Sequence, residues 1–162
     1  MLDDPEDMLG ACLKKHGLSF STTAPADLTR AEREAIAQKP PLCAYLNAEV
    51  RDQLVAGDVL AAQLWSTTAQ QAIDAAPHLA FVYPPEGFPL YCDCADILRE
   101  SRRVRLAHQF LDYLLRPAVS AKIVESTQTA TADAAALELL PDAVRRTPSL
   151  YPPPEVFDLR PR

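Results

Sequence analysis

Two residues that could together hold an organic cation lie two positions apart in one short stretch of the chain. Tyr91 and Asp93 fall within residues 90–98, an extended segment that is predicted to be a strand. Alternate residues of a strand share one face, so the phenol ring and the carboxylate would stand side by side. Aromatic faces attract cations, and a carboxylate binds an ammonium group through a charge-assisted hydrogen bond. The pair therefore indicates an ammonium site, although Asp93 also fits an edge-strand aspartate that faces water.

The only tryptophan, Trp65, is the third residue of interest. It ends an apolar run, residues 59–65, that is predicted to be a buried strand. Ser66 then caps a predicted helix that extends to about Ala75. From these residues alone, Trp65 fits two interpretations, a half-buried core aromatic or a ring that stacks on a ligand. Both place the indole at the junction between a strand and a helix.

Other kinds of chemistry find little support in the sequence. The four cysteines lack the spacing of a standard zinc site, and Cys92 and Cys94 lie too far apart on a strand for easy disulfide geometry. We therefore predict four reduced, small buried thiols and no bound metal. The chain has four glycines, no nucleophile elbow and no phosphate-binding loop. These observations predict a protein that is not an enzyme and needs no cofactor.

Composition and charge narrow the class of protein further. The chain has 162 residues, of which 48% are hydrophobic and 23% charged, as in globular domains. The net charge of −6 argues against nucleic acid as a partner, because nucleic acids bind basic faces. A local run of arginines is expected to be a solvated helix face, with phosphate binding as a second possibility; it comprises Arg99, Arg102, Arg103 and Arg105.

Hydrophobic periodicity and the positions of prolines and glycines predict alternating helices and strands. Helices are expected at residues 5–16, 27–39, 48–56, 66–75, 102–115, 117–125 and 131–140. Strands are expected at residues 42–46, 59–65, 79–83 and 90–98. This alternation is typical of an α/β protein. Residues 147–162 contain five prolines and are expected to form a poorly structured tail.

The order of several short motifs resembles the spermidine/putrescine-binding proteins of bacterial ABC importers. The motifs that carry the resemblance are GDV at 57–59, WS at 65–66, PPEG at 84–87, YCD at 91–93, FLDYLLRPAV at 110–119 and LYP at 150–152. No one of these motifs is specific, and the resemblance depends on their order and spacing. It runs, with gaps, from about Asp3 to Pro153.

The resemblance implies a partial α/β fold of the type II periplasmic-binding-protein class, corresponding to about the second half of a two-lobed receptor. Residues 1–83 would form the distal part of the second lobe, with an αβα run at the start. Residues 84–90 would be the hinge and crossover segment, and the hinge itself would run from Tyr83 to Phe88. Residues 91–146 would return to the first lobe, and 147–162 would be the proline-rich tail.

The same resemblance gives the candidate residues their roles. Trp65 would stack on the methylene groups of a polyamine, and Tyr91 stands where the family usually has a second tryptophan. Asp93 would pair with an ammonium group of a linear di- or triamine such as putrescine or spermidine. The implied partner is an ABC permease of the inner membrane, which places the protein in the periplasm, and nucleic acid is not expected to bind.

Two further expectations concern the start of the chain and its assembly. The acidic residues after Met1 do not resemble a signal peptide, which is expected of an excised piece or of a degenerate gene product. Half of a receptor would expose apolar surface, so self-association is expected. The alternative function is a stand-alone interaction module that keeps the scaffold but has lost ligand binding.

Overall fold

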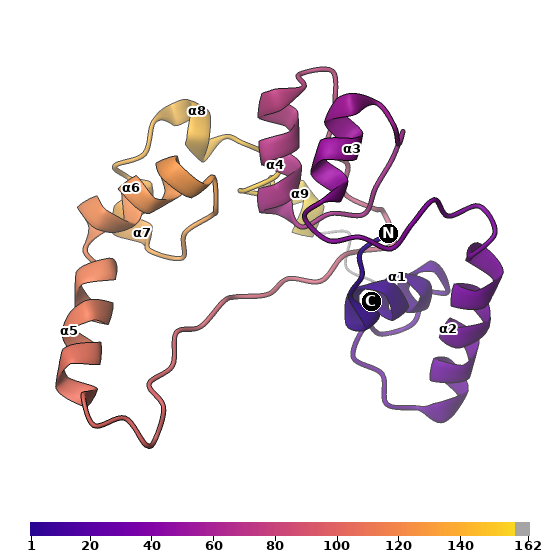
Figure 1. Ribbon diagram of the computed structural model, residues 1–162, viewed down its shortest axis with the longest axis horizontal. Coiled ribbons are helices and arrows are strands. Elements are labelled where there is room, and N and C mark those ends of the chain that lie inside the picture. The colour runs from indigo at the N-terminus through magenta and orange to yellow at the C-terminus, as the bar shows by residue number, and fades with distance from the viewer. Residues whose placement is uncertain (158–162) are drawn as a thin grey trace. The chain divides into compact units, whose positions relative to one another are not determined.

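The computed structural model describes residues 1–157, which form nine helices joined by turns and extended segments (Figure 1). The chain divides into two compact units. Within the described residues, unit 1 consists of Met1–Leu90 and residues 152–157, and unit 2 consists of Tyr91–Tyr151. None of the helices in the described range combines the length and the apolar character that a membrane span requires.

Unit 1 begins with a pair of packed helices, α1 (Pro5–Lys15) and α2 (Pro25–Gln38). The predicted start of α1 is confirmed, because Asp4 Oδ1 accepts hydrogen bonds from the backbone N–H groups of Glu6 and Asp7 at 2.9 and 3.0 Å. Pro5 follows as the first helical residue, where its missing N–H costs nothing. The core between the helices consists of Cys12, Leu13, Ala31 and Ala35.

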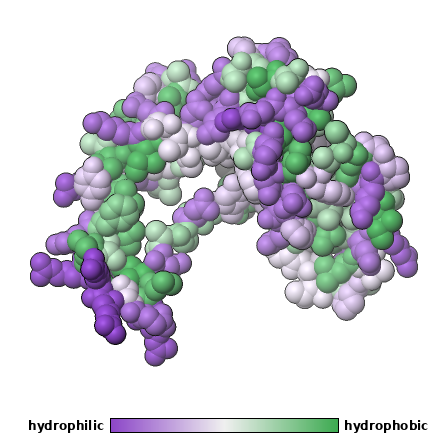
Figure 2. All heavy atoms as spheres, viewed as in Figure 1, coloured by the Kyte–Doolittle hydropathy of each residue, from purple (hydrophilic) through white to green (hydrophobic). Residues whose placement is uncertain are grey.

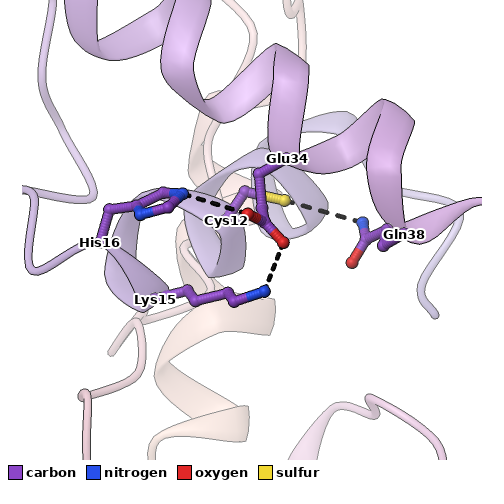
Figure 3. A network of polar contacts seen from close by, with 5 residues as sticks. All are labelled: Cys12, Lys15, His16, Glu34 and Gln38. Carbon is purple, nitrogen blue, oxygen red and sulfur yellow. Dashed lines mark hydrogen bonds and ion pairs between the residues drawn. The ribbon is translucent and has the colours of Figure 1, made fainter.

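A polar network crosses the same helix pair (Figure 3). Glu34 of α2 forms ion pairs with Lys15 and with His16, the latter at 3.2 Å between Nε2 and Oε2. The hydrogen bond from Lys15 lowers the pKa of Glu34 below its usual value. Gln38 Nε2 donates to Cys12 Sγ at 3.6 Å. The network thus fixes how the last turn of α1 meets α2.

The segment at 42–46, which was predicted to be a strand, is not a regular strand, but its backbone is hydrogen-bonded to the first residues of the chain. Met1 N donates to the Ala44 carbonyl at 3.1 Å. Leu46 N donates to the Met1 carbonyl at 3.0 Å, and Asp3 N donates to the Leu46 carbonyl at 3.3 Å. Hydrogen bonds that alternate in this way between two segments follow the pattern of parallel pairing.

The remainder of unit 1 contains a second helix pair, α3 (Val50–Ala56) and α4 (Ser66–Ala75). Gly57 ends α3 in the left-handed conformation, with φ 81°, which glycine adopts without steric cost. Val50 and Leu54 are buried on α3, and Thr68, Ala69 and Ala72 are buried on α4. A short helix, α9 (Pro154–Phe157), belongs to the C-terminal part of the unit.

None of the four predicted strands forms a regular β-ladder within residues 1–157, so the α/β class is not confirmed. The segments at 59–65, 79–83 and 90–98 contain no regular strand. Leu60 is 96% exposed, and Val82 and Leu90 are also largely exposed. The physical reason is that an extended segment becomes a sheet only when another strand accepts and donates its backbone hydrogen bonds.

Unit 2 is built from α5 (Val104–Leu114), α6 (Pro117–Thr127), α7 (Ala134–Leu137) and α8 (Asp142–Arg145). Its core consists of Ala121, Val124, Ala136 and Leu140, packed against Leu137, Val144 and Tyr151. Asp133 caps α7, which is shorter than the predicted helix at 131–140. Helix α5 contributes no buried residue to this core.

The C-terminal segment differs from the poorly structured tail that its prolines predicted. Ser149 and Leu150 are buried, and Tyr151 packs against the core of unit 2. A turn at 147–151 places them there, because the N–H groups of Leu150 and Tyr151 both donate to the Thr147 carbonyl. Residues 158–162, the end of the predicted tail, lie outside the described residues.

A first prediction concerns Gly10, which lies on α1 under the ring of Phe20. A Cβ atom at this position would lie 1.9 Å from Phe20 Cε2, so the ring would have to move. Gly10→Ala gains about 1 kcal/mol of helix propensity but loses about 1–3 kcal/mol through overpacking. We expect a net loss of about 1 kcal/mol in the free energy of unfolding, measured by urea denaturation.

The matched control is the same substitution in a Phe20→Ala background, where the obstructing ring is gone. There Gly10→Ala should raise the free energy of unfolding by about 1 kcal/mol through helix propensity alone. An equal effect of Gly10→Ala in both backgrounds would show that Phe20 does not constrain position 10.

Candidate functional site

Trp65 lies where the extended segment 59–65 meets α4, as the sequence predicted. It is the N-cap residue of α4, with φ −67° and ψ 146°, and its side chain is half-buried. Its indole Nε1 donates a hydrogen bond to Asp7 Oδ2 at 2.9 Å. The site therefore joins the first turn of α1 to the start of α4, two elements separated by 58 residues.

Asp7 accepts hydrogen bonds from two residues of the 59–65 segment. Its backbone carbonyl accepts a second hydrogen bond, from Gln63 Nε2 at 3.2 Å. Gln63 and Trp65 are alternate residues of one extended segment, so they reach Asp7 from the same side. The backbone N–H of Asp7 also donates a hydrogen bond to Oδ1 of Asp4, the N-cap residue of α1. A carboxylate has about four lone-pair positions, so Asp7 can hold the indole and still accept from a cation.

The analysis of the sequence missed Asp7. An acidic residue in the first turn of a helix is expected from the helix dipole alone, so Asp7 carried no separate signal. Its contact with Trp65 spans 58 positions, a separation for which no local pattern exists. Only the way in which α1 meets the 59–65 segment brings the two together.

Tyr91 and Asp93 lie in unit 2, at the start of the extended segment that precedes α5. Both side chains are exposed, and so are their neighbours Cys92 and Cys94. Trp65 belongs to unit 1. The structure therefore describes the tryptophan and the tyrosine–aspartate pair as features of separate units, and their joint use in one site stays a prediction.

The turn at 84–87 is braced by aromatic rings within unit 1. Gly87 has φ 99°, a conformation that favours glycine, and its N–H donates to the Pro84 carbonyl at 3.0 Å. The ring of Tyr83 packs on Phe81 with centroids 4.9 Å apart and on Phe88 with centroids 4.7 Å apart. Burial raises the pKa of the Tyr83 hydroxyl. The turn is thus held from both of its ends.

The cysteines occupy two different environments. Cys12 is buried in the α1–α2 core, where burial raises the pKa of its thiol. Cys43, Cys92 and Cys94 are exposed free thiols, so the prediction of small buried thiols is correct for Cys12 and wrong for these three. They are exposed because their extended segments have no covering element. Within residues 1–157, no three His, Cys, Asp or Glu side chains gather to share a metal ion.

Comparison with known proteins adds an independent line of evidence. No family model matches the chain. The putrescine-binding periplasmic protein PotF of Escherichia coli is 30% identical over 162 residues, with 96% of this chain and 44% of the relative covered. The spermidine/putrescine-binding periplasmic protein 1 of Haemophilus influenzae is 24% identical, with 97% of this chain and 44% of the relative covered. The resemblance to spermidine/putrescine-binding proteins is confirmed.

Solved structures agree with this resemblance. A protein described as a spermidine/putrescine ABC transporter from Listeria monocytogenes superposes with a TM-score of 0.82 at 22% identity, covering 97% of this chain and 48% of the other. The substrate-binding protein PotD from Streptococcus pneumoniae gives 0.73 at 21% identity, covering 97% and 49%. The chain thus has the fold of the matching part of such substrate-binding proteins. It spans about half the length of the curated relatives it matches.

A second prediction tests the Trp65–Asp7 contact. Hydrogen bonds to charged groups contribute about 1.5–3 kcal/mol, and this one is partly buried. We expect Asp7→Ala and Trp65→Phe each to lower the free energy of unfolding by about 1–2 kcal/mol, and the double variant to lose less than the sum. Urea denaturation followed by circular dichroism measures all three.

Glu6→Ala is the control for this experiment, because Glu6 is an exposed acid in the same first turn of α1. It removes a favourable charge near the helix dipole, worth about 0.3–1 kcal/mol, without touching the indole. Strict additivity of Asp7→Ala and Trp65→Phe would show that the two side chains are not coupled.

Proposed function

We propose that the chain is part of a solute-binding protein for linear di- or triamines. The observation that carries this proposal is the similarity of almost the whole chain to relatives that are named for spermidine, putrescine or cadaverine. These relatives are named as binding proteins rather than enzymes, which agrees with the non-catalytic role predicted from the sequence.

The chemistry of the candidate residues suits such a ligand. A polyamine alternates ammonium groups with methylene chains, and aromatic faces both cover methylenes and attract ammonium groups. Trp65 and Tyr91 would supply these faces, and Asp93 would pair with one ammonium group. Asp7 would supply a second carboxylate beside Trp65, whose indole it already holds at 2.9 Å. Two acids at different points of the site match a ligand with two separated charges.

The proposal includes a closing motion. In a two-lobed receptor of the kind that the resemblance implies, closure of the lobes would bury the ligand. The closed form would then be recognised by an ABC permease of the inner membrane, with the protein in the periplasm. The alternative of an interaction module without a ligand is not favoured by the comparisons, because the relatives are named as binding proteins.

A third prediction tests the ligand. Calorimetry with spermidine and with putrescine should detect weak binding, with a Kd of about 1 mM, since the chain spans about half of its relatives. Asp93→Asn and Trp65→Ala should each weaken binding by roughly 10- to 100-fold, because one charge-assisted hydrogen bond or one stacked ring is worth about 1.5–3 kcal/mol. Higher salt should weaken binding further.

Asp96→Asn is the matched control, because Asp96 is an exposed aspartate on the same extended segment, three residues beyond Asp93. It makes the same change in net charge and should leave the affinity within about twofold, since it removes no predicted contact. Absence of heat with both amines, together with unchanged Trp65 fluorescence, would favour the interaction module. Binding that survives Asp93→Asn intact would show that this carboxylate is not in the site.

A further inference from the structure

We propose that Cys92 and Cys94 form a binding site for a soft monovalent metal ion, Cu(I), which two thiolates hold between them. Both residues lie on the extended segment that precedes α5, and both are exposed free thiols. One residue, Asp93, separates them in the sequence. The proposal is independent of the proposed polyamine ligand, since no aromatic ring and no carboxylate serves as a metal ligand in it.

The two thiols reach toward each other along the chain. Cys92 Sγ reaches forward to the carbonyl oxygen of Asp93, at 3.7 Å. Cys94 Sγ reaches back to the carbonyl oxygen of Cys92, also at 3.7 Å. A thiol is a weak hydrogen-bond donor, so contacts of this kind give way to a stronger bond between sulfur and a metal. Both sulfur atoms therefore lie within the span of residues 92–94, where one ion can contact both.

The spacing of the pair suits a metal bridge better than a disulfide. Alternate residues of an extended chain lie on the same face, two steps of about 3.3 Å apart. A disulfide requires sulfur atoms about 2.05 Å apart and Cβ atoms about 3.5–4.5 Å apart. An ion between the sulfurs adds two metal–thiolate bonds of about 2.3 Å each, so sulfurs up to about 4.6 Å apart can share it. The metal bridge therefore demands much less rearrangement of the backbone at Asp93.

The number and the type of the ligands select the metal. Thiolates are soft ligands and favour soft ions such as Cu(I). Structural zinc takes four ligands, and catalytic zinc takes three from the protein. Within residues 1–157, no three His, Cys, Asp or Glu side chains gather to share an ion. An ion that two thiolates satisfy therefore fits the site, whereas an ion that needs three or four protein ligands does not.

The surroundings of the pair admit a cation. Residues 91–96 are all exposed, so an ion has an open path to both thiols. Figure 2 shows hydrophilic residues beside hydrophobic ones along the extended segment that leads into α5. The sequence from 91 to 98 contains the acids Asp93 and Asp96 and no basic residue, and the chain has a net charge of −6. Negative charge near the thiols raises the local concentration of cations.

The other two cysteines lack these features. Cys12 is buried in the core between α1 and α2. Cys43 is exposed, but it lies in unit 1 and is far in the sequence from every other cysteine. The sequence predicted no bound metal because it predicted buried thiols and lacked the spacing of a zinc site. The exposure of Cys92 and Cys94 removes the first reason, and the second reason concerns zinc alone.

Binding exchanges protons for the metal ion. Each thiol gives up one proton, and its sulfur donates an electron pair to the copper. Two thiols and one Cu(I) ion thus give one copper dithiolate anion and two protons, so atoms and charge balance. No electron is transferred, and the step needs neither an oxidant nor a reductant.

The fourth prediction tests this site with the reduced chain and Cu(I), in the absence of oxygen and of polyamine. Titration against a coloured Cu(I) chelator should give one tightly bound ion per chain. Two protons should be released for each bound ion, and X-ray absorption should show two sulfur neighbours around the copper. Light scattering should show the same particle mass before and after copper is added, because one chain supplies both ligands.

Matched serine variants make the test specific. Cys92→Ser and Cys94→Ser each remove one sulfur and keep a side chain of similar shape. Outer partners of metal ligands are worth about 10- to 100-fold in affinity, so loss of one of only two ligands should cost at least about 100-fold. Cys43→Ser removes an exposed thiol outside the pair and should leave the affinity for Cu(I) unchanged. All three positions are exposed, so circular dichroism should show the same fold for every variant.

Four results would overturn the proposal. The first is copper binding that is no tighter in the unmodified chain than in Cys92→Ser. The second is an equal loss of affinity in Cys43→Ser and Cys94→Ser. The third is one copper ion for every two chains with a rise in particle mass, which would assign the thiols to a bridge between chains. The fourth is Zn(II) that displaces Cu(I) at equal concentration, which would show that the two thiolates do not select a soft ion.

Discussion

The backbone N–H and C=O groups of an extended segment need hydrogen-bond partners on a neighbouring segment, and most of the structure depends on this constraint. Helices satisfy their own N–H and C=O groups, so all nine form within the described residues. The extended segments depend on other chain segments instead. Residues near Met1 and Ala44 meet this need in part, through three alternating bonds. In the other extended segments, Leu60, Val82 and Leu90 are exposed.

The same constraint explains why the candidate residues occur as two separate groups. Trp65 is fixed because its side chain, rather than its backbone, finds a partner in Asp7. Tyr91 and Asp93 are exposed on a segment that forms no regular strand within residues 1–157. Leu106, Phe110 and Tyr113 of α5 belong to the same unit and are exposed as well.

Local sequence signals allowed much of the helical structure to be predicted, but the contacts between residues far apart in the sequence could not be predicted. Asp4 and Pro5 marked the start of α1, because caps act within one turn. Ser66 was predicted to cap α4 but is its first residue; Trp65 is the N-cap, and no side-chain hydrogen bond closes that end of the helix. Leu28 and Ile36 share the helical spacing of Ala31 and Ala35 but are exposed, because the core between α1 and α2 takes only the small residues Ala31 and Ala35 of α2. The predicted strands were not confirmed, because a strand depends on a partner segment that no local stretch of sequence contains. Asp7 was missed for the same reason.

The separation of Trp65 from Asp7 has a consequence for the order of folding. The α1–α2 pair closes a short loop and can form early, whereas the Met1–Ala44 bond spans 43 residues and the Trp65–Asp7 bond spans 58. The entropic cost of closing a loop rises with the logarithm of its length. Once the earlier contacts exist, each later contact joins segments that are already near each other. Because Trp65 is the sole tryptophan, the change in its fluorescence during refolding would report when the Trp65–Asp7 contact forms.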